Sequence, residues 1–149
     1  MQKHKYKRVR ISKNVELKSG LEEVIYNYLK DKKVHFVYEG MRITFNQPTL
    51  TKHYTPDFPL NQSFIIESKG AFNSQDRKKH KLIKEQHPEL DIRFIFSNSK
   101  TKIGKKSTTT YGKWCDLFNF KYHCVASTKI PFPQDWLTEV KGKQNARRN

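Results

Sequence analysis

Acidic residues are scarce in this chain of 149 residues, which has 14 Asp and Glu against 30 Lys and Arg and a formal net charge of +16. Such an excess of one sign repels itself unless a polyanion binds, and nucleic acid is the most common polyanionic partner. An anionic membrane surface would instead require a basic amphipathic helix with a lipid-facing apolar side, and none stands alone in the sequence. The charge therefore predicts a nucleic-acid partner and no membrane partner.

Cysteine and long apolar runs are also scarce. The two cysteines, Cys115 and Cys124, are too few for a disulfide framework and lack the paired spacing of a zinc site. The six histidines show no zinc-ligand spacing either. No apolar stretch is long enough to cross a bilayer, and the first residues contain no apolar signal-peptide segment. These absences predict a cytoplasmic protein without structural disulfides or zinc.

The length suits one domain with a core of its own. The apolar pattern predicts helices that begin after Ser19 and Ser74 and a third at about residues 110–118, with strands at 34–39, 43–45, 57–60, 64–69 and 92–96. This order of elements predicts an α/β domain in which helices flank a mixed β-sheet. The pattern after residue 130 is irregular. We expect a basic flexible arm at residues 1–18, the folded domain at 19–140 and a basic tail at 141–149.

Two acids lie on either side of a predicted hairpin turn. If the hairpin is centred on Gln62, Asp57 lies directly opposite Glu67, and two facing carboxylates repel each other unless a cation is near. Lys69 shares the strand face of Glu67 and supplies part of that positive charge. Mg²⁺ would supply the rest, because it binds one or two carboxylates and leaves positions for water and phosphate. The alternative is an exposed hairpin edge with ordinary charges.

Glu22 allows two interpretations. Ser19 and Glu22 have the spacing of a capping box, in which the Glu22 carboxylate accepts a hydrogen bond from the backbone N–H of Ser19. A carboxylate in the first turn of a helix could instead reach a metal, provided that the helix end points at the hairpin. Glu23 is the neighbouring acid, but it lies about 100° further round the helix. Spacing alone favours the capping role over the metal-binding role.

Basic residues cluster in three places where phosphate contact is as good an interpretation as a solvated surface. The residues that we predict to contact DNA are Lys5, Lys7, Arg8, Arg10 and Lys13 in the arm, Arg77, Lys78, Lys79 and His80 in the second helix, and Lys102, Lys105 and Lys106 in a later loop.

Several phrases of the sequence together resemble the phage endonuclease I family. They are Ser19-Gly20-Leu21-Glu22, Tyr54-Thr55-Pro56-Asp57-Phe58, Glu67-Ser68-Lys69-Gly70, Asp76-Arg77-Lys78-Lys79-His80, Glu85-Gln86-His87-Pro88-Glu89-Leu90-Asp91-Ile92-Arg93 and Thr110-Tyr111-Gly112. The resemblance implies a restriction-endonuclease-like core in a domain-swapped homodimer. It also implies a hydrolase of DNA recombination that cuts four-way (Holliday) junctions and other branched DNA with Mg²⁺, or Mn²⁺ in its place, and with no small-molecule cofactor.

The same resemblance implies roles for individual residues. Glu22, Asp57, Glu67 and Lys69 would be catalytic, and two metal ions per site would be held by Glu22, Asp57, Glu67 and the backbone carbonyl of Ser68. The products would be nicks with 5′-phosphate and 3′-hydroxyl ends, made in the cytoplasm of a phage's host cell. Two alternatives stay open, namely a non-catalytic basic protein that packages nucleic acid and a nuclease of the same core with a sequence-specific target.

Overall fold

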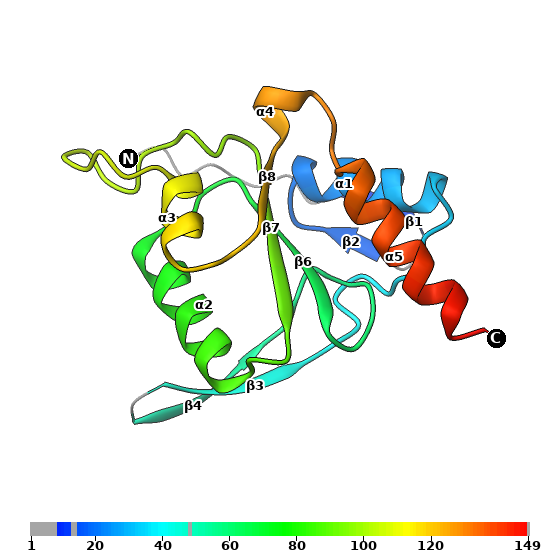
Figure 1. The fold of residues 1–149 in the computed structure, drawn as a ribbon, viewed down its shortest axis with the longest axis horizontal. Coiled ribbons are helices and arrows are strands. Elements are labelled where there is room, and N and C mark those ends of the chain that lie inside the picture. The colour runs from blue at the N-terminus through cyan, green and yellow to red at the C-terminus, as the bar shows by residue number, and fades with distance from the viewer. Residues whose placement is uncertain (1–8, 13–14, 48, 149) are drawn as a thin grey trace.

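A four-stranded mixed sheet with strand order β5–β6–β7–β8 lies at the centre of the computed structural model, which describes residues 9–12, 15–47 and 49–148 (Figure 1). Strands β5 and β6 are antiparallel, whereas β6–β7 and β7–β8 are parallel, so the predicted mixed sheet in an α/β protein is confirmed. The elements in chain order are β1 (Val9–Ser12), β2 (Val15–Leu17), α1 (Gly20–Asp31), β3 (Ile43–Gln47), β4 (Leu50–Tyr54), β5 (Phe58–Pro59), β6 (Phe64–Lys69), α2 (Ser74–Gln86), β7 (Asp91–Phe96), α3 (Tyr111–Leu117), β8 (Tyr122–Cys124), α4 (Val125–Thr128) and α5 (Gln134–Ala146).

Helices cover both faces of this sheet. Side chains alternate between the two faces along each strand, so the strands present apolar side chains to the helices on both sides. Phe64 and Ile66 of β6 join the apolar cluster formed with α1 and α5. Ile65, between them, joins a second cluster with α2 and α3 on the opposite face. Figure 1 shows these two pairs of helices on either side of the central strands. The sheet thus separates two cores, and β6 contributes to both.

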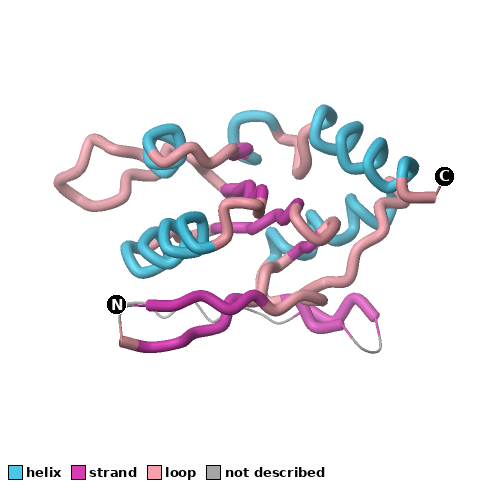
Figure 2. The backbone as a smooth tube through the Cα atoms, turned by 60° about the horizontal axis from the view of Figure 1, so that its bottom comes forward, coloured by secondary structure: helices cyan, strands magenta, loops and turns pink. Residues whose placement is uncertain are grey.

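Two smaller hairpins complete the fold, one formed by β1 and β2 and the other by β3 and β4. Figure 2 shows the β3–β4 hairpin extended along one side of the molecule beside α2. The Gln86 side chain binds both the N–H and the carbonyl of Asn46, and the His87 ring binds the carbonyl of Thr44. The end of α2 therefore holds the edge of β3 that β4 leaves free.

Two predicted features in the interior of the chain are wrong. Residues 34–39 form no strand, although Val34 and Phe36 are buried as the alternation indicated. This stretch has no sheet partner among the described residues, and it ends in a turn in which the Gly40 N–H donates to the Val37 carbonyl. The second helix is capped by Asn73 and not by Ser74, which is its first residue.

Both ends of the chain contain more regular structure than predicted. β1 and β2 lie within the expected arm, and Leu17 is fully buried in the core beneath α1. Helix α5 runs through residue 146 and so crosses the expected boundary of the tail at 140, because Trp136, Leu137 and Val140 give it a buried face. The irregular pattern ends at Pro133, which precedes the helix and therefore does not interrupt it. Within the described ranges, no helix combines the length and the apolar character needed to traverse a bilayer.

Candidate active site

The β5–β6 hairpin places two carboxylates side by side. Its register pairs Phe58 with Ile66, as a hairpin centred on Gln62 requires, so Asp57 lies opposite Glu67. The Asn61 side chain fixes the turn by accepting two backbone N–H bonds, at 2.8 and 2.7 Å. The backbone N–H of Asp57 lies 3.3 Å from Oε2 of Glu67. The predicted opposition of the two acids is therefore present in the structure.

Both carboxylates are removed from solvent, with Asp57 8% and Glu67 4% exposed. Burial raises the pKa of Asp57 well above its ordinary value, and the charges of Glu67 and Glu22 raise this pKa further. Burial also raises the pKa of Glu67, while the Lys69 ammonium group acts in the opposite direction. Two buried acids with raised pKa values need a nearby cation to stay ionised together at neutral pH.

Glu22 reaches the same site from the first turn of α1. Its side chain is buried, and its Oε2 accepts hydrogen bonds from the backbone N–H of Lys18 at 2.8 Å and from the Tyr38 hydroxyl. Ser19 caps α1 as predicted, since its Oγ accepts from the Glu22 N–H at 3.2 Å. The capping-box prediction had the Glu22 carboxylate accept a hydrogen bond from the backbone N–H of Ser19. In the structure it accepts from the backbone N–H of Lys18 instead, so that part of the prediction is wrong. Glu22 thus combines a role at the helix end with a position near enough to Asp57 for its charge to raise the pKa of that carboxyl group.

Lys69 lies between two acids at the end of β6. Its Nζ is 3.8 Å from Oε1 of Glu67 and 3.7 Å from Oδ1 of Asp76, and the same Asp76 oxygen lies 3.7 Å from Lys79 Nζ. Only 13% of the Lys69 side chain is exposed. Asp76 therefore fixes the position of Lys69 from α2, although no role had been predicted for it.

Ser68 contacts Asp57 through both its backbone and its side chain. Its N–H lies 3.0 Å and its Oγ 2.8 Å from Oδ2 of Asp57. The N–H and C=O of one strand residue point to the same edge, so the Ser68 carbonyl also points toward Asp57. In the described ranges, no three His, Cys, Asp or Glu side chains are arranged to hold a metal by themselves. The oxygen donors gathered here are carboxylates together with this backbone carbonyl.

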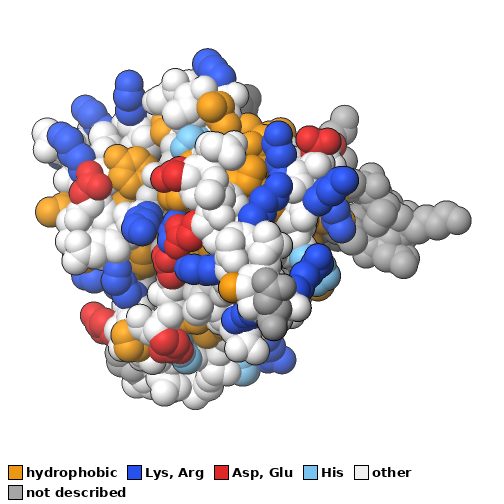
Figure 3. Space-filling model, turned by 45° about the vertical axis from the view of Figure 1, so that its right-hand side comes forward, with side chains coloured by type: hydrophobic (Ala, Val, Ile, Leu, Met, Phe, Trp, Pro, Cys, Tyr) orange, Lys and Arg blue, Asp and Glu red, His pale blue; other side chains and the backbone are white. Residues whose placement is uncertain are grey.

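An open cleft of about 410 Å³ lies beside these groups, although Asp57 and Glu67 themselves do not line it. Glu22 lines it from α1, and Ser68 and Lys69 line it from β6. On the face drawn in Figure 3, Lys and Arg side chains are spread widely, with fewer Asp and Glu side chains among them. A surface with such an excess of positive charge attracts a polyanion.

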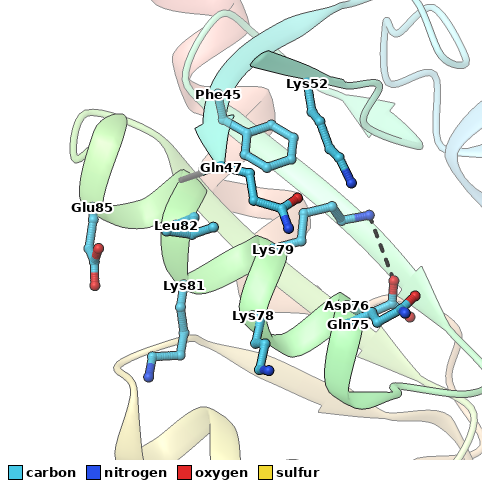
Figure 4. Close-up of a pocket in the computed structure, with 10 residues that line it drawn as sticks. All are labelled: Phe45, Gln47, Lys52, Gln75, Asp76, Lys78, Lys79, Lys81, Leu82 and Glu85. Atoms are coloured by element: carbon cyan, nitrogen blue, oxygen red, sulfur yellow. Dashed lines mark ion pairs between the residues drawn. The ribbon is translucent and has the colours of Figure 1, made fainter. Parts of the chain in front are cut away.

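A larger groove, of about 720 Å³, lies between the β3–β4 hairpin and α2. Figure 4 shows Lys52 of β4 reaching toward Lys79 of α2, whose ammonium group points at Asp76. Phe45 and Leu82 are among the apolar residues that line it. Asp76 lines this groove and contacts Lys69, which lines the cleft. A single contact between two side chains therefore connects the groove with the cleft.

A family model described as phage endonuclease I matches residues 1–147. The chain belongs to the phage endonuclease I family. It is 44% identical over 136 residues to "Endodeoxyribonuclease 1" of Enterobacteria phage T3, with 89% of this chain and 90% of the relative covered. It is 43% identical over 124 residues to "Endonuclease I" of Escherichia phage T7, with 83% and 80% covered. The resemblance drawn from the sequence motifs is confirmed.

For this member of the phage endonuclease I family, the predicted DNA contacts on α2 differ in accessibility. Lys78 is exposed and Lys79 half-buried, whereas the Arg77 guanidinium donates to the carbonyl of Phe72. His80 is fully buried and packs edge-on against the rings of Tyr54 and Phe94. A ring without exposed surface cannot touch a phosphate, so the prediction for His80 is wrong in this conformation. Burial and the nearby lysines lower its pKa, which keeps the ring neutral.

The other predicted DNA contacts lie in two regions. Lys102, Lys105 and Lys106 are exposed on the loop between β7 and α3, which projects from the body of the molecule (Figure 1). The predictions for the arm, at Lys5, Lys7, Arg8 and Lys13 and at the Arg10 side chain, lie outside the described residues and side chains.

Sequence reasoning missed three residues that contact the site, namely Tyr38, Tyr54 and Asp76. The Tyr54 hydroxyl donates to Oε2 of Glu67, as Tyr38 does to Glu22. Tyr54 and Asp76 both stand in phrases shared with the phage endonuclease I family, which is a signal that could have identified them. Tyr38 had no such signal, because it lies in an irregular segment that was expected to be a strand.

Proposed function

We propose that this protein is a structure-selective, divalent-metal-dependent DNA endonuclease that nicks and resolves four-way (Holliday) junctions and other branched DNA. The observation that carries the proposal is the pair of opposed, buried carboxylates, Asp57 and Glu67, with Glu22 beside them and Lys69 within 3.8 Å of Glu67. Membership of the phage endonuclease I family and the names of the T3 and T7 relatives support a DNA-cutting activity.

The donors at the site fit a hard cation, since all of them are oxygens. Asp57, Glu67 and the Ser68 carbonyl would hold one Mg²⁺ or Mn²⁺ ion, and Glu22 with Asp57 would help to hold a second. Bound there, the ions would supply an activated nucleophile and positive charge for the transition state of phosphodiester hydrolysis. The raised pKa values of Asp57 and Glu67 support this assignment, because a cation relieves the repulsion that raises them.

Lys69 is the protein's own cation at the reacting phosphate. Glu67 and Asp76 hold its ammonium group on two sides, so its position is set before substrate binds. From there it would orient the attacking water and contact a non-bridging phosphate oxygen, which stabilises developing negative charge. Attack in line with the 3′ oxygen would leave 5′-phosphate and 3′-hydroxyl ends.

The surface around the cleft suggests a path for the DNA backbone. The groove between the β3–β4 hairpin and α2 presents Lys52 and Lys79 and joins the cleft through Asp76 (Figure 4). We propose that phosphates next to the scissile one lie along it. Exposed Lys78 and the 102–106 loop would contact phosphates further away, and none of these contacts reads base sequence.

We also propose that the enzyme acts as a domain-swapped homodimer, because a junction has two strands to cut and a symmetric dimer presents two sites. In the single chain, β3 and β4 form an antiparallel hairpin in which Gln47 lies opposite Leu50, so the chain direction reverses across the connector between these two residues. Thr49 there has φ 104°, a region that is strained for a β-branched residue. An extended connector would relieve this strain and let Glu22 of one chain join the hairpin of the other.

Cleavage and binding assays on Asp57→Ala and Glu67→Ala test the proposed function. Both variants should lose Mg²⁺-dependent cutting of a four-way junction and keep wild-type junction affinity in Ca²⁺. Glu85→Ala, which removes an exposed acid from the groove, is the matched control and should keep cutting. Wild-type protein that binds junctions but never cuts them would identify a packaging protein instead.

A further inference from the structure

Glu22, Asp57 and Glu67 each have one carboxylate oxygen that accepts two hydrogen bonds from the protein. For Glu22, Oε2 accepts from the Lys18 N–H and the Tyr38 hydroxyl. For Glu67, Oε2 accepts from the Tyr54 hydroxyl and, at 3.3 Å, from the Asp57 N–H. For Asp57, Oδ2 accepts both the N–H and the hydroxyl of Ser68. The same pattern thus occurs three times, at Glu22 in α1, at Glu67 in β6 and at Asp57 just before β5.

The second oxygen of each carboxylate is left for another partner. Within the described residues, neither Oε1 of Glu22 and Glu67 nor Oδ1 of Asp57 accepts a hydrogen bond. Oε1 of Glu67 is the oxygen that lies 3.8 Å from the Lys69 ammonium group, so it faces the positive charge of the site. One oxygen of each pair is therefore occupied by the protein, and the other accepts no hydrogen bond from the described residues.

We infer that Tyr38, Tyr54 and the Ser68 hydroxyl are positioning residues, each of which fixes one carboxylate so that one of its two oxygens stays available for metal binding. The inference rests on the proposed metal-dependent function and adds residues and a coordination mode to it. We call the three hydroxyl groups the carboxylate clamp. None of them touches substrate or metal; each acts through the carboxylate that it holds.

Burial makes the two tyrosines effective as clamps. Tyr54 is 3% exposed, and its ring packs edge-on against the His80 ring at 5.2 Å between centroids. Tyr38 is half-buried, with its ring 5.4 Å from that of Phe58, the strand residue next to Asp57. Rings that are packed in this way lose little rotamer freedom when the hydroxyl engages a carboxylate. Groups that orient metal ligands in this manner typically change metal affinity about 10- to 100-fold when they are removed.

Binding of Mn²⁺ to the DNA-free protein, measured by titration calorimetry and by the electron paramagnetic resonance signal of free Mn²⁺, tests the clamp. Tyr38→Phe and Tyr54→Phe should each raise the Mn²⁺ dissociation constant about 10- to 100-fold. Because the carboxylates themselves remain, the rate of junction cutting should return toward wild type when Mn²⁺ is saturating. A purely structural defect would lower the rate at every Mn²⁺ concentration.

Matched variants separate the clamp from a general packing effect. Tyr26→Phe and Tyr111→Phe remove hydroxyls from two buried tyrosines that donate no hydrogen bond among the described residues, and both should bind Mn²⁺ like wild type. Ser68→Ala should weaken Mn²⁺ binding, and Ser68→Thr, which keeps a hydroxyl, should restore it. The serine pair keeps the test decisive even if a tyrosine variant does not fold.

Three results would count against the inference. Wild-type Mn²⁺ affinity in Tyr38→Phe, Tyr54→Phe and Ser68→Ala, alongside abolished binding in Asp57→Ala, would overturn the clamp and leave the proposed function standing. Equal weakening in Tyr26→Phe and Tyr38→Phe would also overturn the clamp. Wild-type protein that binds no Mn²⁺ at all would overturn the metal-dependent function and the clamp together.

Discussion

Replacing Asp57 by Asn should stabilise the metal-free protein while it abolishes cutting. The folded protein raises the pKa of Asp57 above its unfolded value, mainly through burial and then through the charges of Glu67 and Glu22. The stability that Asp57 contributes is therefore full at low pH and is lost as the pH rises through its folded pKa. An Asn side chain keeps an oxygen for the Ser68 donors and carries no charge, so it avoids this loss.

The size of the effect follows from the hairpin register. The Cβ atoms of directly opposed strand residues lie about 5 Å apart, and two unit charges at a similar separation repel by about 3 kcal/mol at an effective dielectric constant of about 20. The two Ser68 donors and the Lys69 charge offset part of this repulsion. We therefore expect a gain of roughly 1–3 kcal/mol, or a rise in melting temperature of about 3–10 °C for a domain of this size.

Differential scanning calorimetry in EDTA at pH 8 and pH 5 measures this difference. Asp57→Asn should melt higher than wild type at pH 8 and lose most of that advantage at pH 5. Asp76→Asn is a control that should change the melting temperature in the opposite direction. Asp76 lies 3.7 Å from both Lys69 and Lys79, so removing its charge should destabilise the protein. An Asp57→Asn protein that is no more stable than wild type at pH 8 in EDTA would refute the reasoning.

Three further predictions concern other parts of the molecule. Deleting residues 1–8 should lower the slope of log affinity against log salt on duplex DNA by about 0.9 for each phosphate that these residues neutralise, and an unchanged slope would show that they stay off the DNA. A heterodimer of Glu22→Ala and Asp57→Ala chains, purified through two tags, should nick one strand of a junction if the sites are composite, whereas a heterodimer that binds but never nicks would exclude the swapped arrangement. Phe72→Ala should destabilise the protein by about 3–5 kcal/mol, because the ring is fully buried against those of Phe94 and Trp114, and calorimetry should show a melting temperature about 10 °C lower.

The part of the site that could be predicted from the sequence depends on local geometry. The register that opposes Asp57 and Glu67 follows from the length of one hairpin turn, and strand alternation then puts Lys69 on the face of Glu67. Ser19 at the start of α1 and Thr110 at the start of α3 cap their helices through their own side chains, which is again a local property.

The parts that could not be predicted depend on contacts between distant segments. Tyr38 meets Glu22 across an irregular segment, and Asp76 meets Lys69 only because α2 packs beside the end of β6. His80 stands in a run of basic residues that is typical of a solvated face, yet it points into the core because α2 turns that side toward Phe94. The C-terminal helix was missed because two prolines precede it, although its buried face is regular.

The most direct test of the proposed function compares a four-way junction with a linear duplex of matched sequence, each incubated with wild-type protein in Mg²⁺ and in EDTA. The proposal predicts paired nicks in the junction in Mg²⁺ only, much slower cutting of the linear duplex, and 5′-phosphate ends that DNA ligase can reseal. Equal cutting of both substrates at one sequence would identify a sequence-specific nuclease, and full cutting of the junction in EDTA would contradict the role given to Asp57, Glu67 and a metal ion.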